Sequence, residues 1–284
     1  MSEYVEIFEV GPRDGLQNES RHIPTEDKIA LINCLSQAGF RRIEVASFVS
    51  PKWVPQMADS GAVLQGITRA EGISYAALTP NMRGFEAAVQ ADADEIAIFG
   101  SASEGFSKAN INASIAESLA RFAPINEARS TAGLAMRGYV SCVVECPYDG
   151  PTDPAQVAKV AKSLLDMGCY EISLGDTLGR ATPEAVAAML DAVLEVVPAP
   201  QLAGHFHDTA GRAMANIEVS LAKGLRVFDA AVGGLGGCPY APGAAGNVAT
   251  ETVEAGLRAR GYDTGLDPEV LQKAGALAKA MRAA

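Results

Sequence analysis

Two kinds of hydrophobic pattern alternate along this chain. Short segments rich in Val, Ile, Leu and Ala predict buried strands at residues 4–10, 42–46, 73–78, 95–99, 134–144, 170–174, 202–205 and 227–232. Longer segments after them predict helices at residues 25–38, 82–90, 111–127, 154–167, 183–196, 212–223 and 248–260, with a shorter helix ending near 68. Residues 100–110 are expected to form a long loop, and residues 268–281 a further amphipathic helix.

This regular alternation is typical of a parallel sheet covered by helices on both faces. Eight strand–helix units within 284 residues predict an α/β fold, a closed (β/α)8 TIM barrel with an additional C-terminal helix. An open doubly wound sheet is the alternative. We expect a single catalytic domain over residues 1–284, with the barrel at about 4–260 and a C-terminal helical extension at about 261–284.

If the barrel forms, its site must lie at the carboxyl ends of the strands, where the βα loops gather. Polar residues with chemical potential do follow several predicted strands. They are Arg13 and Asp14 after the first strand, Ser47 after the second, Asp176 after the sixth, and His205 and His207 at the end of the seventh. Their coincidence at one end of the barrel is a stronger indication than any single motif.

His205-Phe206-His207 closes the seventh predicted strand. Side chains at i and i+2 share a face, so both imidazoles aim at one point while Phe206 turns away to pack. Two of the three histidines of the chain have this spacing, and converging imidazoles commonly hold a divalent metal. We therefore predict a metal site here. The alternative is a pair of polar residues that only closes a strand.

Asp14 is the natural carboxylate partner of the two imidazoles, although Asp in a Pro-Arg-Asp-Gly sequence is also at home in a turn. Such nitrogen and oxygen ligands suit Mg²⁺, Mn²⁺, Fe²⁺ or Zn²⁺. If Glu44 points into the barrel, it is a buried charge, and Arg13 is the candidate partner. Arg13 then forms either a core salt bridge only, or also a fixed cation facing a developing oxyanion.

The segment 233–243, dense in Gly and Pro, follows the last predicted strand. It is either a long connector or a mobile lid that approaches a ligand, and its spacing is not that of a dinucleotide fingerprint. Cys238 in this segment is either an inert thiol or a reactive group. Asn247 is either a helix N-cap or an amide ligand. Asp176 is either a direct ligand or an acceptor behind the ligands. Trp53 is expected to pack against the barrel rim.

Composition narrows the classes of partner. A net charge of −11 and a pI near 4.8 argue against nonspecific binding to nucleic acid or to a membrane surface. No segment approaches the roughly 18 apolar residues of a membrane span. The five cysteines are scattered, and the N-terminal MSEYVEIFEV is acidic and unlike a signal peptide. We therefore expect a reduced, cytoplasmic protein.

Seven stretches of this sequence together resemble the metal-dependent lyases and synthases of the DRE-TIM type, and among them the 3-hydroxy-3-methylglutaryl-CoA lyases. The stretches are GPRDGLQNE, EVASFVSPKWVPQMAD, FSKANINASIAES, RGYVSC, GCYEISLGDTLG, HFHDT and GGLGGCPYAPGAAGNVATE. They extend from Gly11 to Glu251. The glycine-rich stretch with Cys238 is the part that the related synthases do not share.

The resemblance implies particular site residues. It implies a divalent cation, Mg²⁺ or Mn²⁺, held by Asp14, His205, His207 and Asn247. It implies catalytic roles for Arg13, Asp14, His205 and Cys238, with support from Glu44 and Asp176. It implies contacts to a CoA thioester from Arg13, Gln17, Ser47, Lys108 and Asn110, although Ala109 stands where a second basic residue is common in the family.

The resemblance also implies a reaction. 3-Hydroxy-3-methylglutaryl-CoA would be cleaved between C2 and C3 to acetyl-CoA and acetoacetate, in leucine degradation and ketone-body formation. The alternatives are a lyase for a longer 3-hydroxy-3-alkylglutaryl-CoA, a carbon–carbon-forming synthase of the same type, and a metal-binding scaffold without turnover. The synthases usually carry a further regulatory domain. We also expect a homo-oligomer, a dimer or higher.

Overall fold

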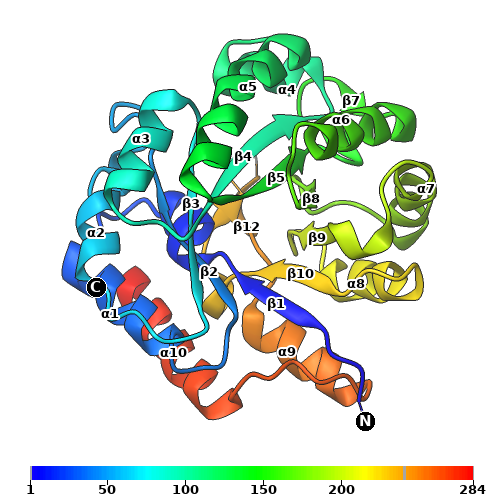
Figure 1. Cartoon of the computed structure of the whole chain (residues 1–284). Helices are drawn as coiled ribbons and strands as arrows, with labels where there is room; N and C mark the ends of the chain where they lie inside the picture. The colour runs from blue at the N-terminus through cyan, green and yellow to red at the C-terminus, as the bar shows by residue number, and fades with distance from the viewer. Residues whose placement is uncertain (1, 239–240, 284) are drawn as a thin grey trace.

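The computed structural model describes residues 2–238 and 241–283, without the side chains of residues 237–245 and 283. Eight parallel strands close into one barrel (Figure 1), in the order β1-β10-β9-β8-β5-β4-β3-β2. They are β1 (Glu6–Glu9), β2 (Arg42–Ser47), β3 (Ser74–Leu78), β4 (Glu95–Ser101), β5 (Ala135–Ser141), β8 (Glu171–Asp176), β9 (Leu202–Phe206) and β10 (Val227–Ala230). The prediction of a TIM barrel is confirmed.

Helices surround the barrel and follow the strands in sequence. They are α1 (Thr25–Leu35), α2 (Ser60–Gly66), α3 (Met82–Gln90), α4 (Glu104–Ile111), α5 (Ile115–Ala132), α6 (Pro154–Asp166), α7 (Pro183–Leu194), α8 (Ala213–Ala222) and α9 (Thr250–Ala259). The additional helix α10 (Pro268–Ala283) packs against α1. None of the helices described here has the length and apolar composition to cross a bilayer.

The prediction of a long loop after β4 is wrong, because this segment contains the helix α4. The hydroxyl of Ser103 caps this helix by accepting a hydrogen bond from the backbone N–H of Phe106. Asn112, with φ of 48°, ends it in the left-handed region. A capping box between Ser114 and Glu117 then starts α5. Hydrophobic periodicity does not separate two helices joined so closely, whereas these caps do.

The strands of the barrel bury apolar side chains outward, against the helices, and several charged side chains inward. On β4, Ile96 and Ile98 belong to the apolar core shared with the helices. On β5, the alternate residues Arg137 and Tyr139 are both buried, and Arg137 contacts the buried Asp229 of β10 across the interior. The interior of this barrel is therefore polar along part of its length.

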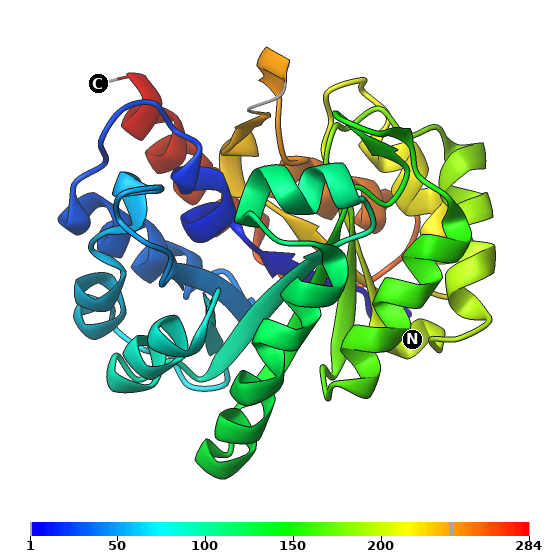
Figure 2. The same cartoon turned by 90° about the horizontal axis from the view of Figure 1, so that it is seen from above.

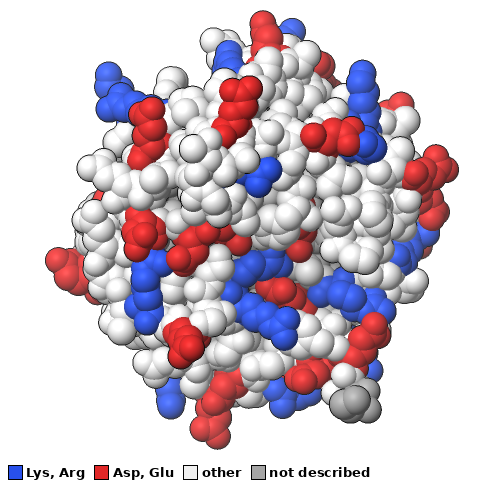
Figure 3. Space-filling model, in the orientation of Figure 1, with Lys and Arg blue, Asp and Glu red and all other residues white. Residues whose placement is uncertain are grey.

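Short elements at the carboxyl ends of the strands carry the candidate site residues. Figure 2 shows β12 (Ala241–Ala245), which pairs with β11 (Gly237–Cys238), on the side of the barrel away from the N-terminus. At this end also lie the π-helical turn η1 (Gly11–Gly15), after β1, and the 3-10 turn η4 (Val232–Gly234), after β10. The face shown in Figure 3 carries a mixture of acidic and basic side chains rather than one sign of charge.

Candidate metal centre and active site

Asp14, His205 and His207 meet at the carboxyl ends of β1 and β9. Each offers one ligand atom, and these atoms all lie within 4.8 Å of one another. Nε2 of His205 is 3.9 Å from Oδ2 of Asp14, and the centroids of the two imidazole rings are 5.4 Å apart. Within the described part of the chain, no other group of three His, Cys, Asp or Glu residues is arranged in this way.

The protonation states of this group suit a cation. Burial opposes ionisation of Asp14, but Arg13 and the two imidazoles bring its pKa to about 2. Burial lowers the pKa of His207 to about 4, so its ring is neutral near pH 7. Nδ1 of His207 is buried without a hydrogen-bond partner, so the ligand group contains an unsatisfied polar atom. An ionised carboxylate with a neutral imidazole at His207 therefore fits a divalent cation. Burial opposes protonation of His205, but Asp229 and Asp14 raise its pKa, so a bound cation would displace a proton from this ring.

Asn247 adjoins the group from the segment after β12. Its Nδ2 donates a 2.8 Å hydrogen bond to Oδ2 of Asp14, and its backbone forms an isolated β-bridge with that of His207. The alternative interpretation of Asn247 as a helix N-cap is wrong, because Ala249 is the N-cap of α9. Rotating the amide by half a turn would direct Oδ1 at the ligand group.

Arg13 is held between two carboxylates. Its Nε donates to Oε2 of Glu44 at 2.6 Å, and its Nη1 donates to Oδ1 of Asp14 at 2.7 Å. The hydroxyl of Tyr139 donates to the same oxygen of Glu44 at 3.1 Å, and its ring centroid is 5.4 Å from the guanidinium carbon. Burial raises the pKa of Glu44, an effect that Arg13 opposes. The turn η1 lets Arg13 and Asp14 face the same cavity, which two neighbours in a strand could not do.

A cavity of about 410 Å³ opens beside this group. Arg13, Asp14, His205 and His207 line it on the polar side. Most of the remaining lining is apolar and includes Val49, Trp53, Val54, Leu78, Phe99, Phe106 and Val140. The expectation that Trp53 packs against the barrel rim is wrong, because its side chain is 86% exposed at the cavity mouth.

The structure divides the residues expected to contact substrate. Gln17 and Asn110 line the cavity, and Nε2 of Gln17 also donates to Oδ1 of Asp14 at 3.2 Å. Lys108 is exposed on α4 and is not part of the lining. Ser47 lines a neighbouring cavity of about 540 Å³, and its buried Oγ has no hydrogen-bond partner.

Asp176 and Cys238 do not form part of the described ligand group. Both carboxylate oxygens of Asp176 accept backbone N–H bonds, from Gly179 at 3.1 Å and from Ala181 at 2.9 Å. Asp176 therefore shapes the loop that packs against His207, since a Cβ on Gly179 would come within 2.8 Å of the Cβ of His207. Cys238 lies in β11, and its side chain falls outside the described residues.

Sequence reasoning missed Asp229, which lies behind His205. Its Oδ2 is 3.1 Å from Nδ1 of His205. Burial opposes its ionisation, but Arg137 and His205 hold its pKa well below the usual range. The sequence did offer one indication of its importance, because Asp229 is the single carboxylate within the otherwise apolar strand Val227–Ala230. The pattern of the chain did not indicate its partner, because Arg137 lies on a different strand.

The barrel and the Asp–His–His group define this chain as a TIM-barrel protein with a site for a divalent cation. The profile of the HMGL-like family matches residues 4–277. The chain therefore belongs to the HMGL-like family.

Named relatives agree with this assignment. The chain is 56% identical over 271 residues to a 3-hydroxy-3-isohexenylglutaryl-CoA/hydroxy-methylglutaryl-CoA lyase of Pseudomonas aeruginosa, covering 95% of this chain and 90% of that protein. The crystal structure of HMG-CoA lyase from Brucella melitensis has a TM-score of 0.99 and 63% identity, covering 100% of both chains. An HMG-CoA lyase from Acinetobacter baumannii, in complex with coenzyme A and 3-methylmalate, has a TM-score of 0.93 and 39% identity, covering 99% of this chain and 92% of that one.

Proposed function

We propose that this chain is a carbon–carbon lyase that cleaves 3-hydroxy-3-methylglutaryl-CoA to acetyl-CoA and acetoacetate, in leucine degradation and ketone-body formation. The observation that carries the proposal is the meeting of a fixed arginine and three potential metal ligands at one cavity. The names of relatives with more than half of their residues identical support the same substrate. A scaffold without turnover would not need a buried cation such as Arg13 beside the ligand group.

The chain's residues can be assigned roles in that cleavage. Asp14, His205, His207 and Asn247 would hold Mg²⁺ or Mn²⁺, which would supply Lewis acidity toward the substrate's hydroxyl group. Asp14 or His205 accepts the hydroxyl proton. The C2–C3 electron pair passes to the thioester as an enolate when acetoacetate leaves, and Arg13 stabilises the enolate oxygen. Cys238 delivers a proton to C2 and completes acetyl-CoA.

Residues around the cavities would position the CoA thioester. Gln17 and Asn110 line the main cavity, and Ser47 lies in the neighbouring one. Both cavities include Val49, so an extended ligand could continue from one into the other. Lys108, exposed on α4, would then contact only a part of the ligand outside the main cavity, such as a phosphate. The related lyase with coenzyme A in its crystal structure supports a CoA thioester as substrate.

A lyase for longer 3-hydroxy-3-alkylglutaryl-CoA substrates is the second candidate. The apolar side chains of the cavity give room for a larger C3 substituent, and the name of one relative includes isohexenylglutaryl-CoA.

We expect a homo-oligomer, a dimer or higher, in the cytoplasm. The described cysteines Cys34, Cys142, Cys146 and Cys169 are free thiols, which fits a reducing compartment. Light scattering would test the oligomer.

The proposal is tested by measuring acetyl-CoA formed from 3-hydroxy-3-methylglutaryl-CoA and from its 3-isohexenyl analogue, with Mg²⁺ or Mn²⁺ present; the second product is acetoacetate from the former and a longer 3-oxo acid from the latter. We expect acetyl-CoA and acetoacetate from the methyl substrate. Turnover of the isohexenyl substrate alone would favour the second candidate, and absence of turnover with either would contradict both.

We further expect that Cys238→Ala lowers kcat by about 10²-fold or more, the scale of general acid catalysis, with metal content unchanged. Cys34→Ala, a thiol elsewhere in the chain, is the matched control. A near-normal kcat in Cys238→Ala would remove this thiol from the reaction.

A further inference from the structure

Asp229 lies where it can orient one of the metal ligands. It pairs with His205 in register between the parallel strands β10 and β9. Its Oδ2 lies 3.1 Å from Nδ1 of His205, while Nε2 on the opposite side of that ring faces Asp14. An ionised carboxylate can only accept hydrogen bonds, so this contact requires a proton on Nδ1 of His205. In the neutral ring, Nε2 then keeps its lone pair for a cation.

The carboxylate of Asp229 is itself fixed from three directions. Nη1 and Nη2 of Arg137 donate to its two oxygens at 3.1 and 2.7 Å, and the hydroxyl of Ser173 donates to Oδ2 at 2.7 Å. The side chains of Arg137 and Asp229 are both fully buried. A bidentate guanidinium pair of this kind restrains both the position and the plane of a carboxylate. The direction of the His205 ring is therefore set by β5, β8 and β10 as well as by its own strand.

His207 has a different environment. In the described structure its ring donates to no carboxylate; it hydrogen-bonds the backbone of Thr177 instead, and its buried Nδ1 has no hydrogen-bond partner. His207 therefore lacks the carboxylate that holds the tautomer of His205.

We propose that Asp229 is a positioning residue, which, with Arg137 behind it, holds His205 in the Nδ1–H tautomer and aims Nε2 at the divalent cation. The inference rests on the proposed metal-dependent function and adds to it. Carboxylates behind ligating histidines raise metal affinity in other proteins by fixing the ring and its tautomer. Asp229 touches neither the cation nor the substrate in this account, and acts only through His205.

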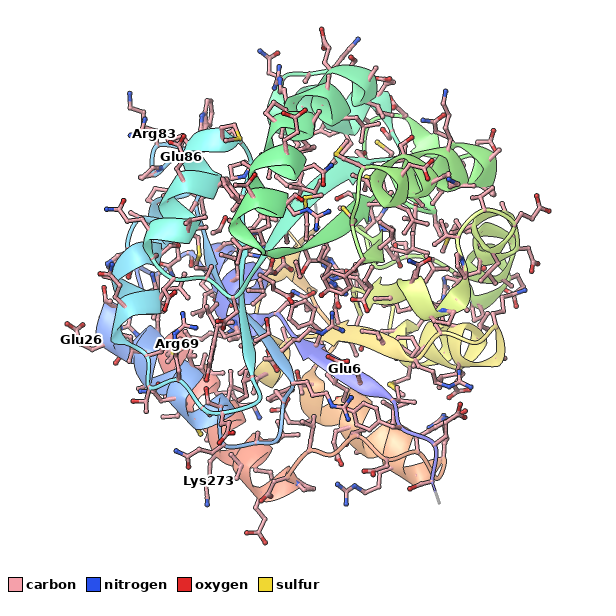
Figure 4. The ribbon with its side chains drawn as sticks, in the orientation of Figure 1. Glu6, Glu26, Arg69, Arg83, Glu86 and Lys273 are labelled. Carbon is pink, nitrogen blue, oxygen red and sulfur yellow. The ribbon has the colours of Figure 1, made fainter. Side chains whose placement is uncertain are left out.

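The barrel interior supplies a matched control. Nε of Arg137 also donates to Oε1 of Glu171 at 2.7 Å, and Glu171 continues through Arg42 to Glu6. Figure 4 labels Glu6 beside β1. Glu171 therefore shares Arg137 with Asp229, and it is nearly as buried, but it has no contact with His205. Glu171→Gln disturbs the same arginine without removing the carboxylate behind the ligand.

The first test compares Mn²⁺ binding to metal-stripped wild-type protein, Asp229→Asn and Glu171→Gln by calorimetric titration. We expect Asp229→Asn to bind Mn²⁺ about 10- to 100-fold more weakly, the range measured for such carboxylates. We expect Glu171→Gln to keep the wild-type dissociation constant, even if it unfolds at a lower temperature. A wild-type dissociation constant in folded Asp229→Asn, or an equal loss in both variants, would overturn the proposal.

The second test needs no variant and so does not depend on Asp229→Asn being stable. The chain has three histidines, so long-range ¹H–¹⁵N spectra of the Mg²⁺-loaded wild-type protein can assign each tautomer, with the exposed His22 as a reference. We expect the proton on Nδ1 of His205. A proton on Nε2 of His205 would refute the inference. Neither readout uses substrate, so failure of the proposed lyase activity would be seen separately in the acetyl-CoA assay.

Discussion

At the scale of single residues, Arg13 joins the two halves of the site. Arg13 is 5% exposed, and the carboxylates of Glu44 and Asp14 keep its guanidinium charged despite burial by raising its pKa. Because these contacts fix the cation before substrate arrives, it can stabilise developing negative charge without reorganising. A buried salt bridge without a catalytic role would be equally fixed, so only kinetics can distinguish the two roles of Arg13.

Arg13→Gln tests that distinction. We expect kcat to fall by about 10²- to 10³-fold, the effect of removing one preorganised donor to an oxyanion, and KM to change much less. Steady-state kinetics with 3-hydroxy-3-methylglutaryl-CoA measures both parameters. Arg69→Gln, at a surface ion pair with Asp94, is the control and should leave both unchanged. An unaltered kcat with a raised KM in Arg13→Gln would assign Arg13 to substrate binding alone.

At the scale of elements, the close approach of η1 to the glycine-rich segment holds Asp14 beside Asn247. A Cβ on Gly15 would lie 2.6 Å from Cβ of Leu235, and one on Gly236 would lie 3.2 Å from Nδ2 of Asn247. Gly236 also has φ of 93°, which favours glycine. These two glycines therefore allow a backbone contact on which the ligand geometry depends.

Gly15→Ala should separate the two segments. We expect a loss of about 1–3 kcal/mol in the free energy of unfolding, the usual cost of overpacking, together with weaker Mn²⁺ binding. Chemical denaturation and metal titration measure the two effects. Gly61→Ala in α2 is the matched control, because no atom lies within 4 Å of its added Cβ; it should leave Mn²⁺ binding unchanged. Equal effects in the two variants would show that the contact of Gly15 with Leu235 is unimportant.

Glu9, at the end of β1, connects the turns η1 and η4 with the start of α9. Its Oε1 accepts the backbone N–H groups of Gly11 and Val232 at 2.8 and 2.9 Å, and its Oε2 accepts the hydroxyl of Thr250 at 2.6 Å. Burial raises the pKa of this carboxyl from about 4.5 to about 7. Folding therefore favours its protonated form, and this contribution to stability is complete below about pH 4.5 and is lost as the pH rises through about 7.

Glu9→Gln removes this ionisation while keeping the shape of the side chain. We expect the free energy of unfolding of the variant, relative to wild type, to rise between pH 5 and 8 by up to about 3 kcal/mol, from about 1.4 kcal/mol for each pKa unit. Urea denaturation at several pH values measures the difference. A difference that stays constant over this range, or falls with pH, would show that Glu9 is already ionised in the folded protein near pH 5.

The strands and most helices could be predicted from the sequence, because their apolar residues recur with a regular period and strands alternate with helices along the chain. Helix α4 could not be predicted in this way, because its start depends on a cap at Ser103 rather than on periodicity. The proximity of Asp14 to the two histidines could be predicted from the topology of the barrel alone. The importance of the carboxylate Asp229 could not, because it lies in contacts with Arg137 and His205, which come from distant strands.

At the scale of the whole molecule, the closed barrel brings the turn η1, after β1, close to the end of β9. β1 pairs with β10, and β10 pairs with β9, so Asp14 and His205 become neighbours although 191 positions separate them (205 − 14). Such a site is absent from the unfolded chain, and cation binding therefore stabilises the folded state by mass action. The account depends on this one ion site more than on any other feature.

The most direct test of that site is the anomalous scattering of manganese in crystals of the Mn²⁺-loaded protein. We predict one strong peak between Asp14, His205 and His207, with ligand distances of about 2.0–2.3 Å, typical of first-row divalent ions, to Nε2 of His205 and to one ring nitrogen of His207. Manganese bound at another position, with these three side chains empty of metal, would contradict the account.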